Sequence, residues 1–517
     1  MKLEIMILAS VGLVLAMPLA RRISVPFPVL LTVLGIVAAL VPGIDHVDID
    51  TESLLPILLP PILWAAASRT SFSHLKRHAG PIVGLAVGLV VVSALMVGAL
   101  LTWLLPNVPW ALAFAVGAAL APPDPVAATS VASRIGLPHR VVNVLEGEGL
   151  VNDATSLTLF NAALAAATAG AALTWTTVVS DFALGVVLGV AVGLAVAWLA
   201  RFVIARLDDV PLERAFELIL PFAAYVVAED LHGSGVLAVL VAGLGVSHSV
   251  FRVTSAESRL ARESLWEALD LLTTGVAFVI IGLEIRVTFQ DNITQARNLI
   301  TAAVVCASLV ILRLCWLSFS GAVRPARFAG QAPANWREGV VMGWAGMRGV
   351  VTIAAVLAMP SDVEQRDALL FVTFVVVLTT LVIGGTTLPM VARWVRVGES
   401  DPQAQLRRIA EPVGRAMLTR IDELNANGEL SEEQRERLHR GCIATLAAIV
   451  PGAAKKLEEK LELSGTAKKV RHGRQARLEI LQAAQDEALH LRADETFDPR
   501  LVDQVLHRID RGLLNLE

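Results

Sequence analysis

Residues 121–125 read Ala-Pro-Pro-Asp-Pro and interrupt an apolar segment that extends over about residues 110–132. Proline lacks an amide proton and its ring clashes with the preceding helical turn, so this stretch cannot continue an α-helix. One proline would suffice for a simple kink, and three within four positions therefore predict a broken helix. Asp124 then lies where its carboxylate can cap the second half-helix, at the partly positive end of that helix.

A second stretch breaks helical continuity near the end of the apolar region. Residues 343–349 read Gly-Trp-Ala-Gly-Met-Arg-Gly within an apolar segment over about residues 337–359. Glycines around Arg348 permit an unwound stretch or a close approach of helices. Interrupted segments at matching places in two halves of a chain indicate an inverted repeat whose site lies where the breaks cross. At that crossing, Asp124 can offset the positive ends of the half-helices and Arg348 the negative ends.

Composition divides the chain into two parts. Of the 517 residues, 55% are hydrophobic and the net charge is −4, with a mean hydropathy of +0.64. Charged residues make up about 13% of the first 400 residues and about 33% of the rest, against about 25% in a typical soluble domain. We therefore expect a transmembrane domain over residues 1–398 and a soluble helical domain over residues 399–517. This composition excludes a soluble enzyme, a secreted disulfide scaffold and a nucleic-acid binder with a basic surface.

Apolar runs of transmembrane length fill the first part. A bilayer core of about 30 Å needs roughly 20 apolar residues per helix. Such runs predict an all-α membrane protein with about thirteen transmembrane helices, at about residues 3–20, 26–41, 54–68, 80–105, 110–132, 141–169, 177–204, 213–230, 233–248, 264–283, 297–321, 337–359 and 367–395.

The charges between these runs predict the orientation of the chain. With the N-terminus outside, the expected inner loops carry sixteen Lys and Arg residues, Arg214, Arg259 and Arg262 among them, and the outer side carries four. This is a strong positive-inside bias. It predicts a multi-pass protein of the plasma membrane whose charged tail lies in the cytoplasm.

The sixth expected span carries several polar residues close together. Residues 146–153 read Glu-Gly-Glu-Gly-Leu-Val-Asn-Asp. Residues four apart share one side of a helix, so Glu148 and Asn152 lie together. Ionisable side chains inside spans are expensive and usually functional. A solvated helix start could explain Glu146, but Asp153 is too deep in the span for that explanation.

Two arginines lie at comparable depth. An unpaired guanidinium among the apolar residues of the eleventh expected span is unfavourable, so Arg313 should face Glu148 or Asp153. A rise of about 1.5 Å per residue places Asp124, Asp153 and Arg348 roughly 18–21 Å from a membrane boundary, close to the midplane. The crossing of the two broken helices is thus expected to hold a buried carboxylate, Asp153.

These motifs resemble those of the bacterial sodium/proton exchangers of the NhaP/NHE type, the first family of monovalent cation–proton antiporters. The resemblance covers the whole membrane domain and is sharpest at residues 148–153, 124–125 and 346–349. It implies a thirteen-helix body, a homodimer, and an elevator-like motion of a core domain past a dimerisation domain. It also implies that Asp153 takes either a cation or a proton, and that Glu148 forms a polar cluster with Asn152 and Arg313.

The sequence departs from the pattern of that family at two positions. Gly149 stands where a serine hydroxyl is common, and Pro123 stands where a threonine commonly precedes the aspartate. The backbone carbonyl of Pro123 could still bind a cation, but Gly149 offers no side-chain oxygen. The missing ligand must come from water or from another residue.

The predicted function is secondary antiport of Na⁺, Li⁺ or K⁺ against H⁺, a role in pH homeostasis that needs no cofactor. The expected cation- and proton-binding residues are Asp153, Asn152, Glu148, Asp124 and Pro123. Of these, Asp153 and Glu148 are the expected carboxylates for the transported cation, and Arg313 and Arg348 are structural charge partners. A single exchangeable carboxylate predicts one proton for one cation, hence electroneutral exchange.

Other functions stay open at this point. One is K⁺/H⁺ exchange, because the Gly149 departure leaves the ion selectivity undetermined. A cation channel belongs to a different class, and channels repeat filter rings around a pore, for which this sequence has no matching segment. An enzyme is a less favoured alternative, because it would need a nucleophile–base pair or a metal cluster, and neither is evident in the apolar spans. The expected partners are monovalent cations, protons, membrane lipid and a second copy of the chain, without nucleic acid.

The tail shows the pattern of a soluble helical domain. Amphipathic periodicity predicts helices at about residues 406–424, 432–450, 477–491 and 501–516. A basic run at residues 468–474 either meets anionic lipid headgroups or forms a solvated surface.

Overall fold

The chain folds as a set of packed helices. The computed structural model describes parts of residues 11–22, four single residues (128, 333, 363 and 497), and residues 27–40, 54–70, 79–124, 137–168, 175–207, 209–250, 256–292, 295–323, 335–360, 365–397, 402–428, 430–449, 472–493 and 499–514. The helices of its first part are α2 (Phe27–Ala38), α3 (Leu54–Arg69), α5 (Ala79–Val83), the π-helix η1 (Gly84–Leu89), α6 (Val90–Leu104), α7 (Trp110–Leu120), α9 (His139–Thr168), α10 (Trp175–Ile204), α11 (Val210–Asp230), α12 (Gly235–Val250), α13 (Ala256–Asn292), α14 (Ala296–Val323), α15 (Trp336–Trp344), α16 (Val350–Leu357) and α17 (Arg366–Val395). Those of the tail are α18 (Pro402–Ala426), α19 (Glu432–Ile449), α21 (His472–Ala493) and α22 (Pro499–Leu514).

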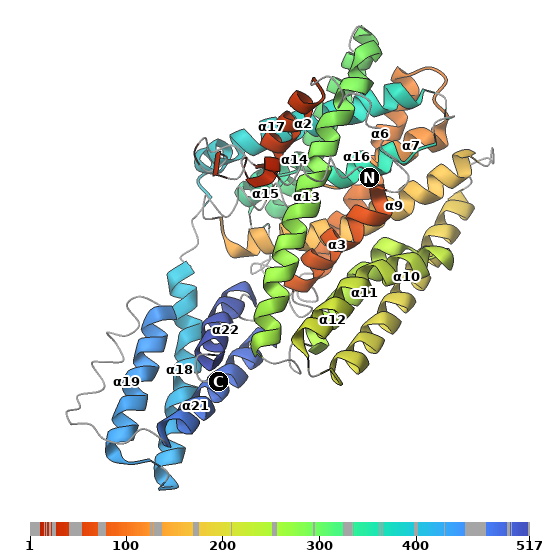
Figure 1. Cartoon of the computed structure of the whole chain (residues 1–517). Helices are drawn as coiled ribbons and strands as arrows, with labels where there is room; N and C mark the ends of the chain where they lie inside the picture. The colour runs from red at the N-terminus through yellow and green to blue at the C-terminus, as the bar shows by residue number, and fades with distance from the viewer. Residues whose placement is uncertain are drawn as a thin grey trace.

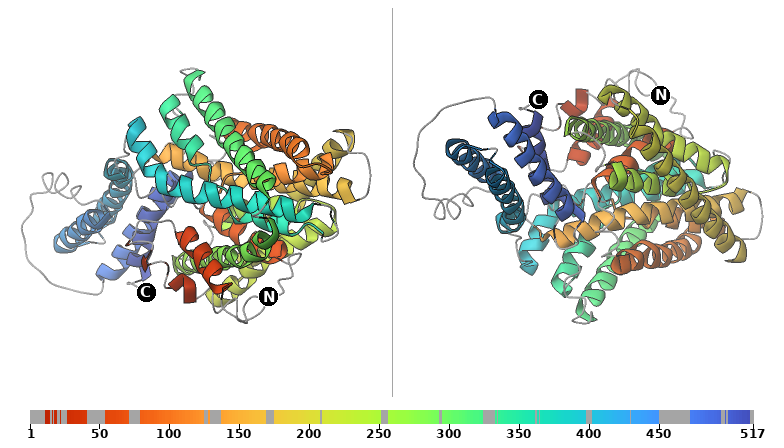
Figure 2. Two further views of the ribbon diagram at one scale, coloured as in Figure 1. Left: turned by 90° about the horizontal axis from the view of Figure 1, so that it is seen from above. Right: turned by 90° about the horizontal axis from the view of Figure 1, so that it is seen from below.

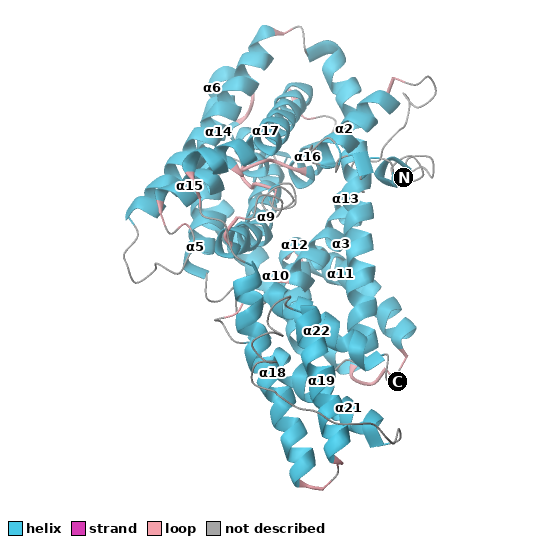
Figure 3. Cartoon of the chain, turned by 90° about the vertical axis from the view of Figure 1, so that its left-hand side faces the viewer, coloured by secondary structure: helices cyan, strands magenta, loops and turns pink. Residues whose placement is uncertain are grey.

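Helices α2 to α17 form one body, and the tail helices form a separate bundle at one end of it (Figure 1). Seen from above and from below, the tail bundle projects to one side of the body (Figure 2). In the body, α10 packs on α12, α6 on α7, and α2 on α13. Large side chains such as Trp64, Phe114, Phe160 and Phe278 are almost completely buried there. Every regular element of the described chain is helical, and only helices and loops are seen in Figure 3.

Among the described residues, the expected apolar runs coincide with helices except at two interruptions and at a few turn residues near the ends of runs. Five helical segments are long and apolar enough to cross a membrane: 84–104, 179–204, 257–284, 296–320 and 366–395. Four further apolar helices are shorter, namely Phe27–Ala38, Leu55–Arg69, Trp110–Leu120 and Gly235–His248. The all-α fold class is confirmed for the described residues. The count of thirteen spans and the inverted repeat stay predictions, and the first expected span lies mostly outside the described residues.

Both predicted helix breaks are present. The first broken helix stops at the end of α7, and residues 121–124 that come next are not helical. The second is interrupted at residues 345–349, between α15 and α16. In each case the interruption falls where the proline or glycine stretch predicts it. Most of the second half of the first broken span, with Pro125, lies outside the described residues.

Three arginines assigned to inner loops are instead buried in helices. Arg214 lies in α11 and Arg259 and Arg262 lie in α13, each with about 8% of its surface exposed. The loop assignment of Arg259 and Arg262 was wrong because α13 begins at Ala256, eight residues before the expected start of that span. Arg214 lies within α11, which begins at Val210, three residues before its expected start. A charged helix end can continue beyond an apolar run when its charges are paired, and here they are. Arg259, for example, donates two hydrogen bonds to Asp510 of the tail, at 2.9 and 2.6 Å.

The tail bundle has its own apolar cluster. Its members lie three or four residues apart along each helix, as on one face of an amphipathic helix; they include Val413, Ile421, Ala484, Val505 and Ile509. The last helix, α22, packs against α13 of the body as well as against α18 and α21. The basic run over residues 468–474 falls outside the residues whose side chains are described.

Candidate functional site

The two helix interruptions meet at Asp124. Its backbone N–H donates a hydrogen bond to the carbonyl of Met347, at 2.6 Å, which joins one interrupted helix to the other. Its carboxylate lies against Gly349, where a Cβ atom would overlap the Oδ2 atom of Asp124. Only glycine leaves room for that carboxylate. Gly349 is also the residue that precedes the first turn of α16, so the negative charge lies at the partly positive end of that helix.

This position differs from the expected cap. The sequence predicts that Asp124 caps the second half of its own broken span, but those residues are mostly outside the described chain. The helix start that its carboxylate meets belongs to the other broken span. A carboxylate can stabilise either helix start because both expose unpaired N–H groups.

A small cavity lies at the crossing, which we call the aspartate cavity. Its volume is about 60 Å³, and Asp153, Asp124, Pro123 and Gly149 are among the residues that line it. Asp153 comes from α9 and is 9% exposed. The structure therefore brings three of the expected ligand residues to one cavity.

Two threonines that the sequence analysis did not single out line the same cavity. Thr352 lies in the first turn of α16 and is 2% exposed, and Thr274 comes from α13 and is 4% exposed. Both threonines thus bring a hydroxyl-bearing side chain to the cavity that Gly149 and Pro123 also line. The place of Thr352 just after the glycine-rich break was the signal that could have found it. Thr274 carried no signal in the sequence, because only the packing of α13 brings it here.

Glu148 does not line the aspartate cavity. It is 1% exposed and forms an ion pair with Arg313 of α14, through hydrogen bonds of 2.5 and 2.8 Å to its two carboxylate oxygens. This bidentate geometry is the strong form of an arginine–carboxylate contact. The expectation that Arg313 faces Glu148 or Asp153 is confirmed for Glu148.

Asn152, the third residue of the expected polar cluster, and Arg348, an expected structural charge partner, are buried as well. Asn152 is completely buried, and both atoms of its amide lack a hydrogen-bond partner among the described residues. Arg348 is 2% exposed, and its Nε and Nη1 atoms likewise lack a partner there. The backbone N–H of Arg348 donates to the Thr380 hydroxyl of α17, at 3.1 Å, which holds the unwound segment. The guanidinium groups of Arg313 and Arg348 are thus buried close to the interruption at residues 345–349. The Asn152 amide and the Arg348 guanidinium keep atoms that could form further hydrogen bonds.

A second buried charge network lies near the tail side of the body, and the sequence analysis missed it. Glu217 of α11 is completely buried and forms ion pairs with Arg214 and with Arg262, the latter at 2.8 Å. The indole N–H groups of Trp266 and Trp64 also donate to its carboxylate, at 3.0 and 3.4 Å. Through Arg262, Trp266 and Trp64, the Glu217 carboxylate links α11 to α13 and α3. Neither Glu217 nor any of these partners lines the aspartate cavity.

The site suits reversible binding of a small cation. Among the described residues, no group of three or more His, Cys, Asp and Glu side chains could hold a resident metal ion. Asp153 and Asp124 instead offer carboxylate oxygens in a space of about 60 Å³, and oxygen is the ligand that hard monovalent cations and protons share. Interrupted helices with a carboxylate at their crossing are the construction of a secondary transporter.

The comparisons identify the kind of transporter. The family model described as "Sodium/hydrogen exchanger, transmembrane" matches residues 6–394. The chain belongs to this sodium/hydrogen exchanger family, so it is a membrane antiporter and not an enzyme. The resemblance that the motifs suggested is confirmed.

Two relatives carry names that agree with this assignment, and a solved structure shares the fold. An uncharacterised Na(+)/H(+) exchanger of Mycobacterium tuberculosis is 30% identical over all of this chain and 95% of its own. A sodium, potassium, lithium and rubidium/H(+) antiporter of Bacillus subtilis is 32% identical over 71% of this chain and 58% of its own. The fold resembles the sodium proton antiporter MjNhaP1 of Methanocaldococcus jannaschii, with a TM-score of 0.61 and 21% identity, over 76% of this chain and 99% of that chain.

Proposed function

We propose that this antiporter exchanges one Na⁺, Li⁺ or K⁺ for one H⁺ by competition at the carboxylate of Asp153. The observation that carries this proposal is the position of Asp153, which is 9% exposed and lines a small cavity at the crossing of two interrupted helices. Desolvation favours the protonated carboxyl, and an arriving cation favours the ionised one. One site therefore holds either a proton or a cation.

The other expected residues have distinct roles in this proposal. Asp124 adds a second carboxylate, the carbonyl of Pro123 offers an oxygen, and the Thr352 hydroxyl replaces the oxygen that Gly149 lacks. Glu148 and Arg313 hold the helices behind the cavity through their ion pair, at 2.5 and 2.8 Å. Asn152 and Arg348 complete that cluster. No cofactor takes part, since the transported ions are the only small species the exchange needs.

The alternative within this class is K⁺/H⁺ exchange. Two relatives are named as antiporters of sodium, potassium, lithium and rubidium. Transport of each of these cations by this chain therefore has to be compared directly. A cation channel is a weaker alternative, because a buried carboxylate suits binding and release rather than continuous conduction.

We further propose that the transmembrane domain over residues 1–398 spans the plasma membrane with its N-terminus outside. The domain over residues 399–517 then lies in the cytoplasm, and two copies form a homodimer. The asymmetry of Lys and Arg between the two sides supports the orientation, and the separate apolar cluster of the tail supports the division.

Transport by the purified protein in proteoliposomes tests the exchange site. Asp153→Asn keeps the shape of the side chain but removes its charge and titration, so exchange of Na⁺, K⁺ and Li⁺ should all vanish while the protein still folds. Asp181→Asn is the matched control, because Asp181 is exposed on α10, and it should transport normally. Retained exchange in Asp153→Asn refutes the site.

The same vesicles test the stoichiometry. Exchange of one cation for one proton moves no net charge, so an imposed membrane potential should leave the rate unchanged. Net movement of one charge would couple to about 2.3 kcal/mol per 100 mV. A steep voltage dependence refutes one-for-one exchange but leaves the site intact.

A further inference from the structure

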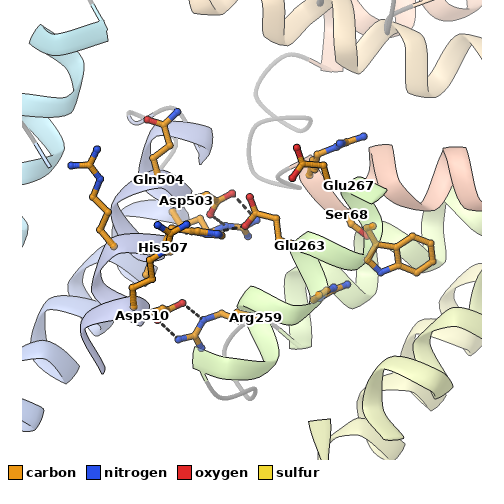
Figure 4. Close-up of a pocket in the computed structure, with 15 residues that line it drawn as sticks. Ser68, Arg259, Glu263, Glu267, Asp503, Gln504, His507 and Asp510 are labelled. Carbon is orange, nitrogen blue, oxygen red and sulfur yellow. Dashed lines mark hydrogen bonds and ion pairs between the residues drawn. The ribbon is translucent and has the colours of Figure 1, made fainter. Parts of the chain in front are cut away.

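Arg69 lies between two cavities. It is the last residue of α3 and lines the aspartate cavity that contains Asp153. It also lines a larger cavity of about 520 Å³ between α13 and the tail helix α22, which we call the junction cavity. Ser68, Glu263 and Glu267 line the junction cavity from the body, and His507 lines it from the tail (Figure 4). Arg69 is therefore a residue that the two cavities share.

The partner of Arg69 also faces the aspartate cavity. The guanidinium of Arg69 forms an ion pair with the carboxylate of Asp270, on α13. The Arg69 side chain is 49% exposed and that of Asp270 is 15% exposed, so the pair lies at the boundary between solvent and the buried site. Thr274, one turn further along α13, places its hydroxyl 3.5 Å from Asp270 and lines the aspartate cavity as well.

The position and exposure of this ion pair suit a gate for cations. A guanidinium in the mouth of the cavity repels a cation, and while it is paired it neutralises the carboxylate that would attract one. Because the Arg69 side chain is 49% exposed, its contact with Asp270 contributes less to stability than a fully buried ion pair, and the guanidinium can turn into solvent. Once Arg69 has turned away, Asp270 presents a free carboxylate between the junction cavity and Asp153.

We propose that the Arg69–Asp270 ion pair is the gate at the tail-side mouth of the aspartate cavity, and that a monovalent cation passes it by replacing the Arg69 guanidinium at Asp270. The identity of the passing ion rests on the exchange function proposed above. The opening and closing of the cavity mouth can be measured without transport. Arg69 and Asp270 are thus access residues, and Asp153 remains the binding carboxylate.

The accessibility of a cysteine inside the cavity tests the gate directly. Thr352→Cys places a thiol in the aspartate cavity, in a full-length chain whose native Cys306, Cys315 and Cys442 are replaced by alanine. The probe is a membrane-impermeant trimethylammonium methanethiosulfonate reagent, applied from the tail side and followed by mass spectrometry. Arg69→Gln should raise the labelling rate at least tenfold, within the range of about 10 to 1000 by which local charge changes association rates.

The two gate residues should respond in opposite directions. Asp270→Asn leaves the Arg69 charge uncompensated, so the cationic reagent should label the introduced thiol more slowly than in the parent. Arg140→Gln is the matched control, because Arg140 is 43% exposed and pairs with the buried Glu338 but lines neither cavity. It should leave the rate unchanged. If the ion pair were only a strut between α3 and α13, both gate variants would change the rate in the same direction, which would overturn the proposal.

Transport supplies an independent readout. The KM for Na⁺ offered from the tail side should fall in Arg69→Gln and rise in Asp270→Asn, with little change at the other side. If neither variant nor the parent exchanges ions while labelling still shows opposite effects, the gate stands and the exchange function fails. An unchanged labelling rate in Arg69→Gln overturns the gate whatever the transport result.

Discussion

Glu148 and Arg313 are separated by 165 residues in the chain and meet as a fully buried ion pair. The attraction between them matters less for stability than the cost of losing one of the two partners. Removing two charges from water is costly, and only the close bidentate contact offsets that cost. A single neutral substitution then leaves one charge buried without its partner.

Arg313→Ala should therefore destabilise the protein strongly, by about 3–5 kcal/mol, because Glu148 keeps its burial but loses its counter-charge. The melting temperature of the purified protein in detergent measures this loss. The double variant Arg313→Ala/Glu148→Ala should recover part of it. Strict additivity of the two single losses would argue against the ion pair.

An exposed pair provides the control for this cycle. Arg415 and Glu411 on α18 are each 72% exposed and lie 3.2 Å apart. Arg415→Ala should change the stability by no more than about 1 kcal/mol, as is usual for surface ion pairs.

At the scale of elements, the two interrupted helices depend on each other. The hydrogen bond from the Asp124 N–H to the Met347 carbonyl, at 2.6 Å, links the two breaks through their backbones. The carboxylate of Asp124 then occupies the space that a side chain at Gly349 would need. Neither break alone would place this carboxylate at the start of α16.

Gly349→Ala should disturb the site although it enlarges the chain by only one methyl group. The new Cβ would overlap the Oδ2 atom of Asp124, so the carboxylate must move away from the start of α16. Exchange in proteoliposomes should fall at least tenfold, a loss of about 1.4 kcal/mol in the transition state. In Gly84→Ala, the control, the added Cβ meets no atom within 4 Å, and equal losses in both variants would contradict the explanation.

The tail helix α19 contains a histidine whose surroundings predict a pH response. Burial, and next the charge of Arg435, lower the pKa of His439 below its ordinary value of 6.5. The unfolded chain therefore binds the proton more readily than the folded one, so the stability of α19 rises with pH. This contribution is fully present above about pH 6.5, the unfolded value, and is lost as the pH falls through the lower folded value.

Hydrogen exchange of residues 432–449 in the full-length chain measures this response. Comparison with His439→Gln at each pH removes the intrinsic pH dependence of the exchange chemistry. Protection in the parent should decrease relative to that variant between about pH 7.5 and pH 5, a range that brackets the ordinary histidine pKa. A constant ratio over this range would show that His439 does not couple its protonation to the folding of α19.

At the scale of the whole molecule, the tail and the body are joined by α13. Its N-terminal turns extend toward the tail, where Arg259 forms a buried ion pair with Asp510 (Figures 1 and 4). A second contact joins Glu263 to His507, at 2.9 Å. The tail therefore lies on the side of the body where Arg69 lines both the junction cavity and the aspartate cavity.

The proposed orientation predicts which positions an impermeant reagent reaches in intact cells. In a chain without the native cysteines, Asp48→Cys should be labelled from outside. Gln475→Cys should be labelled only after the cells are permeabilised, because the proposed orientation places the tail in the cytoplasm. The reverse pattern would contradict the thirteen-span prediction, since one span more or fewer moves the tail to the other side.

The positions and type of most helices could be predicted from the sequence. A bilayer-length apolar run can satisfy its backbone groups only as a helix, and proline and glycine stretches break such helices locally. The expected partner of Arg313 could be predicted for the same reason, because a charge inside a span needs a counter-charge. The extension of α13 could not, since its charged turns are satisfied by residues such as Glu217 and Asp510 that lie far away in the chain.

The sequence by itself determined which residues are charged, where helices break and which family the chain resembles, because these properties are local or depend on composition. Only the tertiary structure decided that Glu148 lies apart from the aspartate cavity while Thr274 and Thr352 line it. It likewise decided that Arg69, which reads as an ordinary loop arginine, faces two cavities at once. The physical reason is that a cavity is defined by the packing of several helices, and the energy of that packing is spread over contacts between residues distant in the chain.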